Sequence, residues 1–298
     1  MDSTDAPQLI EHLRTSLDFT PHDTKWIPHS ARFVCLGISP KGSGTLRIYE
    51  LSRGNVATTL NLPAALPHGI KCGTFGASRI EDRRIALGDY GGNLSICDLE
   101  SSSSTSPSLL PLFSVKKAHD GIINAIDGIG GVSIGCGAPE IATGGRDGVV
   151  NIWDPRVDRA VLSFRAEGGG SSTPRDCWSV CFGGAYNDLE RCVCAGYDNG
   201  DIKLFDMRTN TVRWEGNCRN GVTCVDFDRK DIEMNKMVVT TLESRFRCYD
   251  LRTQHDLDGF NFVSERAHRS TVWVARHSPQ NRDIFMTGGG NGGFNIYK

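Results

Sequence analysis

The chain has 298 residues, with 34 glycines, 8% aromatic residues and a formal net charge of −2. This charge is far from the strongly basic balance of DNA- and RNA-binding domains, so nucleic acid is not an expected partner. The N-terminal sequence MDSTDAPQ is polar and acidic, and the chain lacks the run of about 18 apolar residues that would suggest a membrane span. We therefore expect a soluble, cytoplasmic protein without a secretion signal or membrane segment.

Short apolar segments recur along the chain in groups of four. In chain order, the first segments are TKWIP, KCGTFG, INAIDG, CWSVCFG, VTCVDF and VWVARH, and the second segments are RFVCLG, RIALG, EIATG, RCVCAG, MVVTT and IFMTG. The third segments mostly follow a D-G, N-G or G-G pair, which tolerates the positive φ angles of a tight hairpin. The fourth segments are VATTLNL, LLPLFSV, AVLSFRA, TVRWEGN and FNFVSER. Each group predicts four antiparallel strands.

The third segments also set a regular interval. In TGGRDGVVNIWDPR, Gly148 precedes Trp153 by five residues, and the same interval starts at positions 44, 92, 200, 244 and 292, with Ser244 in place of the glycine. Successive copies are 44 to 56 residues apart, close to the period of about 40–45 residues in WD40 propeller blades. We predict an all-β fold, a WD40 β-propeller with six blade repeats ending near residues 50, 98, 154, 206, 250 and 298, in one domain covering residues 1–298.

Closure of the ring is a separate question, because blades have exposed edges. The sixth repeat stops at Tyr297-Lys298 without an outer strand. The strand-like N-terminal segment at residues 7–14, containing QLIEHLR, is expected to supply that strand. Two arrangements stay open at this stage, a six-bladed ring closed in this way and a seven-bladed ring that lacks one blade.

Polar residues of the third repeat form a candidate structural network. His119, Thr143, Asp147 and Trp153 fall where WD40 blades place a hydrogen-bonded His, Ser/Thr, Asp and Trp set. Such a network stabilises a blade only when all its members are paired. No nucleophile is associated with His119 and Asp147 in any known motif, so we expect a non-catalytic protein.

The eleven cysteines are scattered and odd in number, which argues against a disulfide framework. Cys192 and Cys194 are two residues apart, and Cys177 and Cys181 are four apart, so each pair is expected on one face of a strand. Neither pair has partners at zinc-finger spacing. We expect buried, reduced thiols, no metal site and no cofactor.

Two tryptophans are candidates for partner binding. Trp178 in RDCWSV and Trp273 in STVWVA occupy equivalent places near the entrance of an inner strand. Trp and Arg dominate the energetics of many interfaces, so Trp178 with its neighbours Arg175 and Asp176, together with Trp273, forms a hypothetical protein-binding face. Burial of the tryptophans in the core is the alternative interpretation.

Three consecutive repeats end in WDPR, FDMR and YDLR, which place Arg156, Arg208 and Arg252 two residues after an aspartate. This pattern is similar to a motif by which some WD40 proteins act as substrate receptors of cullin-4 ubiquitin ligases. Arginines that are solvated or paired locally at strand ends are the alternative interpretation.

The chain also contains several loop sequences that a propeller fold does not require. They include IKCGTFGAS, GDYGGNLSI, GAPEIATGGRDG, CAGYDNGDIKLFDMR, FDRKDIEMNK and AHRSTVW. In these segments, from about residue 7 to the C-terminus, the chain resembles the Monad family of WD40-repeat factors, implicated in cytoplasmic preassembly of axonemal dynein arms. The resemblance implies a scaffold that works with RuvB-like ATPases, a prefoldin-like co-chaperone module and dynein chains. It also implies a seven-bladed ring, whose final blade would lie beyond Lys298. A substrate receptor of a cullin-4 type ligase is the alternative function.

Overall fold

The computed structural model describes residues 11, 13–52, 54–99, 111–131, 137–165, 175–255 and 257–298. These residues form 23 β-strands and no helix. They form five sheets of four strands and one sheet of three, each with its strands in sequence order. The structure thereby confirms the predicted all-β propeller with six blades.

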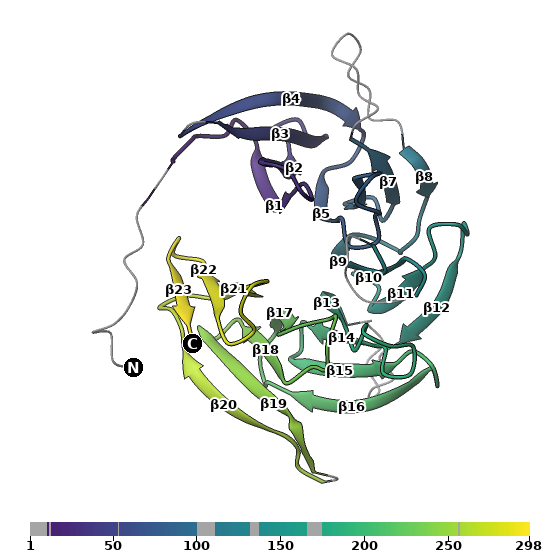
Figure 1. Ribbon diagram of the computed structural model, residues 1–298, viewed down its shortest axis with the longest axis vertical. Helices are drawn as coiled ribbons and strands as arrows, with labels where there is room; N and C mark the ends of the chain where they lie inside the picture. The colour runs from purple at the N-terminus through teal and green to yellow at the C-terminus, as the bar shows by residue number, and fades with distance from the viewer. Residues whose placement is uncertain are drawn as a thin grey trace.

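The strands take four positions from the centre outwards (Figure 1). The inner strands are β1 (Thr20–Trp26), β5 (Ile70–Thr74), β9 (Ile123–Ile129), β13 (Cys177–Gly183), β17 (Val222–Phe227) and β21 (Val272–His277). The second strands are β2 (Arg32–Ile38), β6 (Arg84–Asp89), β10 (Glu140–Gly145), β14 (Cys192–Tyr197), β18 (Lys236–Thr241) and β22 (Phe285–Gly289). The third strands are β3 (Gly44–Ser52), β7 (Leu94–Asp98), β11 (Val149–Trp153), β15 (Asp201–Asp206), β19 (Arg245–His255) and β23 (Phe294–Tyr297). The outer strands are β4 (Asn55–Leu66), β8 (Pro111–Val115), β12 (Ala160–Arg165), β16 (Thr211–Asn217) and β20 (Gly259–Arg266).

We number the sheets blade 1 (β1–β4) to blade 6 (β21–β23) in chain order. The inner strands of consecutive blades contact one another around a central channel. The inner strands enter from the face that carries the turns between second and third strands, which we call the turn face. The opposite face carries the connections between first and second and between third and fourth strands, and we call it the connection face.

Apolar packing between neighbouring blades supplies the core. Ile96, Ile123, Ile141 and Trp153 belong to one buried cluster that joins blades 2 and 3. Between blades 3 and 4, the rings of Phe164 and Phe205 stack with their centroids 4.6 Å apart. Complete burial of one such large apolar side chain contributes about 1.5–3 kcal/mol. The ring is therefore held by side chains that alternate along each strand to meet the two neighbouring blades.

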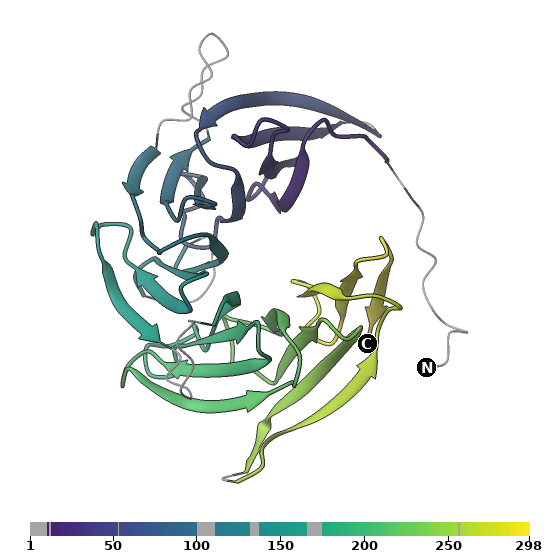
Figure 2. The same ribbon diagram turned by 180° about the vertical axis from the view of Figure 1, so that it is seen from behind.

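The described residues form an open ring, with blade 1 and blade 6 apart in both views (Figure 1 and Figure 2). On blade 1, Phe19 packs against Cys35 and Tyr49, so the segment before β1 covers part of this open face. Blade 6 leaves Phe294 and Ile296 of β23 exposed. Residues 7–10 and 12 of the segment expected to close the ring lie outside the described residues, and closure by this segment stays a prediction.

The turns between second and third strands use the left-handed backbone conformation. Gly148 has a φ of 75°, as expected for the glycine of a D-G pair. Ser244, which replaces the glycine in the fifth repeat, keeps the same conformation with a φ of 66°. The turn geometry is therefore retained even where the side chain disfavours it.

The cysteine expectations are partly wrong. Cys192 and Cys194 do share one buried cluster, with Cys181. Cys177 instead lies in the cluster between blades 3 and 4. The reason is a bulge, because the register of β13 against β14 shifts between Cys177 and Ser179 and reverses the alternation of side chains. All ten cysteines in the described residues are unpaired, and burial raises the pKa of thiols such as Cys97 and Cys192 to about 12.

Candidate protein-binding face

The same irregularity occurs in every inner strand of the described ring. In each blade one residue near the start of the inner strand, the third of β1 and the second of each other inner strand, is left out of the ladder with the second strand while its neighbours pair. Bulges of this kind redirect one side chain and are common at rims and next to functional sites. We call these six residues, all at the turn-face end of the channel, the channel-mouth residues: His22, Lys71, Asn124, Trp178, Thr223 and Trp273.

Both tryptophans named from the sequence belong to this set. Trp273 is 55% exposed, and its indole lies beside the turn of its own blade at Gly290. Trp178 is half-buried against Gly221, where an added Cβ would come within 2.7 Å of its ring. Neither side chain is part of the closed core. The structure therefore places two large aromatic surfaces at the mouth of the channel, on blades 4 and 6.

An acidic pair lies next to Trp178. Burial, and after it the negative charge of Asp198, raise the pKa of Asp176, while a hydrogen bond from the Trp178 side chain works in the opposite direction. The Oδ1 atom of Asp198 is buried without a hydrogen-bond partner among the described residues. Two neighbouring carboxylates, one of which has an oxygen without a donor, favour a cationic or hydrogen-bond-donating group.

Arg175, which directly precedes Asp176 in the chain, is exposed. Its backbone carbonyl packs closely on Gly148, where an added Cβ would lie 2.5 Å from the oxygen. The entrance of blade 4 is thus fixed against the turn of blade 3. Arg175, Asp176 and Trp178 form one local group, and Trp273 lies two blades further along the ring.

The remaining channel-mouth residues were not predicted from the sequence. The His22 ring nitrogen Nε2 hydrogen-bonds the Tyr90 hydroxyl at 3.0 Å. Asn124 donates to the carbonyl of Cys177 at 3.1 Å, which joins blades 3 and 4. Thr223 hydrogen-bonds Thr240 at 2.8 Å. Their shared position, one or two residues after the start of the inner strand, is visible once the repeats are aligned on Trp178.

The four residues of the third repeat form one chain of hydrogen bonds. The His119 Nδ1 atom lies 3.0 Å from Asp147 Oδ1, and Nε2 lies 2.7 Å from the Thr143 hydroxyl. The Trp153 indole N–H donates to the same hydroxyl at 2.8 Å. The His119 side chain is completely buried. This geometry connects the turn face to strands β10 and β11 and engages all four side chains in one network.

Asp147 ties the network to the backbone as well. It accepts hydrogen bonds from the N–H groups of Asp120 at 2.9 Å and Val149 at 3.1 Å. Burial favours the neutral acid, but the hydrogen bond from His119 and these backbone donors outweigh it, so the pKa of Asp147 lies below its ordinary value. Asp147 is therefore a charged anchor of the turn.

The three motif arginines lie on the connection face and differ from one another. Arg156 binds Asp154 through Nε at 2.9 Å and Nη2 at 2.6 Å. Arg252 binds Asp250 in the same way, at 2.9 and 2.8 Å. Arg208 is exposed, and its backbone N–H donates to Asp206 at 2.8 Å, whereas its guanidinium forms no hydrogen bond or ion pair within the described residues. Two of the three arginines are thus paired locally.

No group of three or more His, Cys, Asp or Glu side chains among the described residues is arranged to hold a metal ion. In the same part of the chain, no helix has the length and apolar character needed to cross a membrane.

The sequence similarity to known proteins covers nearly the whole chain. Dynein axonemal assembly factor 10 of Xenopus laevis is 54% identical over 295 residues, which are 99% of this chain and 79% of that protein. The human protein of the same name is 51% identical over 299 residues, covering 100% of this chain and 81% of its own length. The chain belongs to the dynein axonemal assembly factor 10 family. The Chlamydomonas reinhardtii member is 49% identical over 300 residues, 100% of this chain and 81% of its own.

Two further comparisons concern domains and folds. No family model matches the chain. A chain in the crystal structure of the mitotic checkpoint complex superimposes with a TM-score of 0.73 at 14% identity, covering 99% of this chain and 79% of that one. At this identity the similarity establishes the fold alone.

Proposed function

We propose that this chain is a non-catalytic scaffold for protein binding that takes part in the assembly of axonemal dyneins in the cytoplasm. Membership of the family supports the biological role, since its members are named for that process. The proposed partners are dynein chains together with RuvB-like ATPases and a prefoldin-like co-chaperone module, as the resemblance in the repeats implies. Neither a cofactor nor a catalytic residue is part of this proposal.

The observation that carries the proposal is the row of bulged residues at the mouth of the channel. A bulge removes one residue per blade from the ladder and redirects its side chain at the rim of the channel. Trp178 and Trp273 supply large apolar surface, and Arg175 and Asp176 supply charge beside it. Aromatic anchors with flanking polar groups are the composition of interface hot spots.

The test is capture of partners from the cytosol of ciliated cells on the tagged full chain, followed by mass spectrometry. Trp178→Ala and Trp273→Ala are the test variants. Trp26→Ala is a matched control, because Trp26 is also a tryptophan on an inner strand, is 59% exposed, and lies at the connection-face end of β1. We expect wild type and the control to retain dynein chains and RuvB-like ATPases and the test variants to lose them.

Equal recovery by all four proteins would remove the turn face from the proposal. The ligase-receptor alternative has a different signature, namely recovery of the cullin-4 adaptor and its loss when Arg156 and Arg208 are replaced. The ion pairs of Arg156 and Arg252 with their own aspartates do not favour that alternative.

A further inference from the structure

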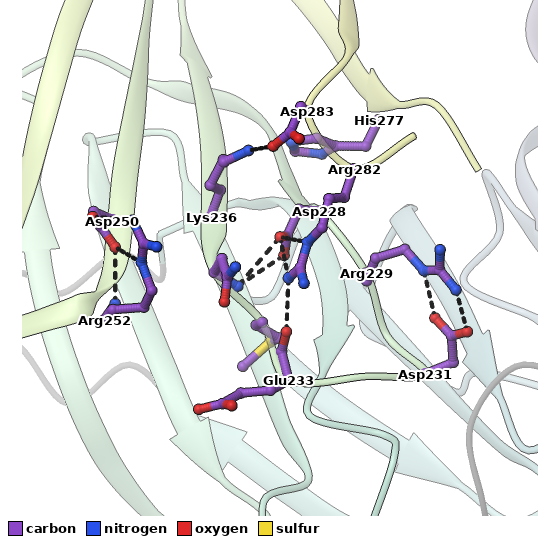
Figure 3. A network of polar contacts seen from close by, with 12 residues as sticks. Asp228, Arg229, Asp231, Glu233, Lys236, Asp250, Arg252, His277, Arg282 and Asp283 are labelled. Carbon is purple, nitrogen blue, oxygen red and sulfur yellow. Dashed lines mark hydrogen bonds and ion pairs between the residues drawn. The ribbon is translucent and has the colours of Figure 1, made fainter. Parts of the chain in front are cut away.

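The interfaces between blades are not closed in the same way on the connection face. Figure 3 shows the interface of blades 5 and 6, where Arg282 reaches across to the buried carboxylate of Asp228, and Lys236 pairs with Asp283. Between blades 3 and 4, Arg191 binds Glu140 at 2.8 Å. These cross-blade ion pairs fill the space where two twisted sheets diverge.

The interface of blades 2 and 3 is open at the corresponding side. A cavity of about 580 Å³ lies there, between the connection of β5 to β6 in blade 2 and the connection of β11 to β12 in blade 3. This volume falls within the range of roughly 300–1,000 Å³ that is usual for ligand sites. The ion pairs of its lining side chains stay within one blade, Arg84 with Asp82 at 3.5 Å and Arg156 with Asp154 at 2.6 Å.

The floor of this cavity is apolar. Ala86, Ile96 and Ile141 line it, and all three belong to the buried cluster that joins blades 2 and 3. Phe113 extends the floor along β8, and its neighbour Leu112 is 57% exposed at the border. An apolar side chain inserted here would continue an existing core and would remove the exposed surface of Leu112 from water.

The border is cationic. Arg79, Arg84 and Arg156 line the cavity with two aspartates, Asp82 and Asp154, so cations exceed anions by one. The Arg79 side chain is exposed and has no hydrogen-bond or ion-pair partner among the described residues. Arg156 is 71% exposed and uses Nε and Nη2 for Asp154, which leaves other N–H donors free. A carboxylate is the group that such a border pairs with best.

We propose that this cavity between blades 2 and 3 binds a short segment of a partner protein in which an apolar side chain adjoins an aspartate or glutamate. The apolar side chain enters above Ile96 and Ile141, and the acidic group binds Arg79 and Arg156 at the border. This site is separate from the channel mouth, since it lies on the connection face. It gives the scaffold a second, independent contact for a different part of a partner or for a different partner.

The test uses ten-residue peptides displayed on phage and selected on the full-length chain. We expect selected sequences to combine Leu, Ile, Phe or Met with a neighbouring Asp or Glu. A synthetic copy of a selected peptide is expected to bind wild type and to bind Arg79→Glu and Leu112→Glu about tenfold more weakly or worse, because the border then repels its carboxylate. Arg208→Glu is the matched control, as an exposed arginine of the same motif set on blade 4, and should leave binding unchanged.

Thermal unfolding monitored by circular dichroism checks that the variants fold, which both exposed positions should allow. Three outcomes would overturn the proposal: selection without acidic and apolar residues together, equal affinity for wild type and the two border variants, or equal affinity after alanine replaces the apolar residue of the peptide. Peptides that lose binding with Trp178→Ala but not with Arg79→Glu would instead assign selection to the channel mouth. None of these results depends on dynein assembly, so failure here and failure of the proposed function are distinguishable.

Discussion

Arg282 donates two hydrogen bonds, through Nε at 2.8 Å and Nη2 at 2.5 Å, to a single oxygen of the Asp228 carboxylate, which is completely buried. The same guanidinium donates to the carbonyl of Glu233 at 2.7 Å, and the backbone N–H of Asn235 approaches Asp228 at 3.1 Å (Figure 3). Blade 6 has a neighbour on one side only among the described residues, so this contact is central to its attachment.

Arg282→Met should therefore release blade 6. The change leaves the Asp228 charge buried without its partner, and we expect it to cost about 3–5 kcal/mol. Hydrogen exchange followed by mass spectrometry should show faster exchange in β21–β23 than in β9–β12. The control is Lys236→Met, because its partner Asp283 is 61% exposed and such a pair contributes about 0–1 kcal/mol. Equal exchange in both variants would contradict the assigned role of Arg282.

Thr143 is expected to be the most sensitive hydroxyl of the third blade. Thr143→Val keeps the shape of the side chain but leaves the buried Trp153 Nε1 without its acceptor and leaves His119 Nε2 with only a 3.5 Å contact to the Asn151 amide. The expected loss in the free energy of unfolding is about 2–4 kcal/mol, measured by urea denaturation. Thr58→Val on the exposed side of β4 is the control and should change stability by less than about 0.5 kcal/mol. A similar small effect at Thr143 would show that the network carries little energy.

Asp147 should make the free energy of unfolding of the ring decrease at acidic pH. Its pKa is lowered in the folded state, so its contribution is present above the unfolded pKa of about 3.9 and is lost as the pH falls through the lower folded value. Asp147→Asn is expected to be less stable than wild type at pH 7, and the difference should shrink below about pH 4. Urea unfolding at pH 7, 5, 4 and 3 measures this, and a difference that stays constant with pH would argue against a charged Asp147.

Ser244 is a position where replacement should stabilise the protein. Its φ of 66° is unfavourable for a side chain with a Cβ, so Ser244→Gly should raise the free energy of unfolding by about 0.5–1 kcal/mol. The same substitution at Ser264, exposed on strand β20, should instead lower it by about 0.5–1 kcal/mol. Thermal unfolding compares the two signs, and destabilisation by both changes would mean that the turn needs the serine side chain.

The repeat pattern was sufficient for the fold because strand order, turn residues and aromatic spacing are all local signals. The hydrogen-bonded set around His119 could be found in the same way, since its members keep fixed offsets within one repeat. Alternation along β13 was not predictable, because a bulge at Trp178 leaves no trace in the polarity of its neighbours, and Cys177 was assigned to the wrong face.

The contacts on the connection face could not be predicted from the sequence for another reason. Arg282 and Asp228 are 54 residues apart, and nothing near either residue identifies the other. The cavity between blades 2 and 3 likewise depends on how two sheets diverge. That the guanidinium of Arg156 borders this cavity, beside its own partner Asp154, is likewise a result of the three-dimensional arrangement.

The bulges at the channel mouth have a consequence for how such a protein evolves. The six residues lie outside the ladder with the second strand, but His22, Asn124 and Thr223 hydrogen-bond elsewhere in the ring. Trp178 and Trp273 are therefore the positions where we expect a substitution to affect mainly a molecule bound at the mouth. The chemistry at the six positions already ranges from indole to amine, amide, hydroxyl and imidazole within one chain. A duplicated gene can thus acquire new specificity one blade at a time, while the repeats that hold the ring together stay under separate selection.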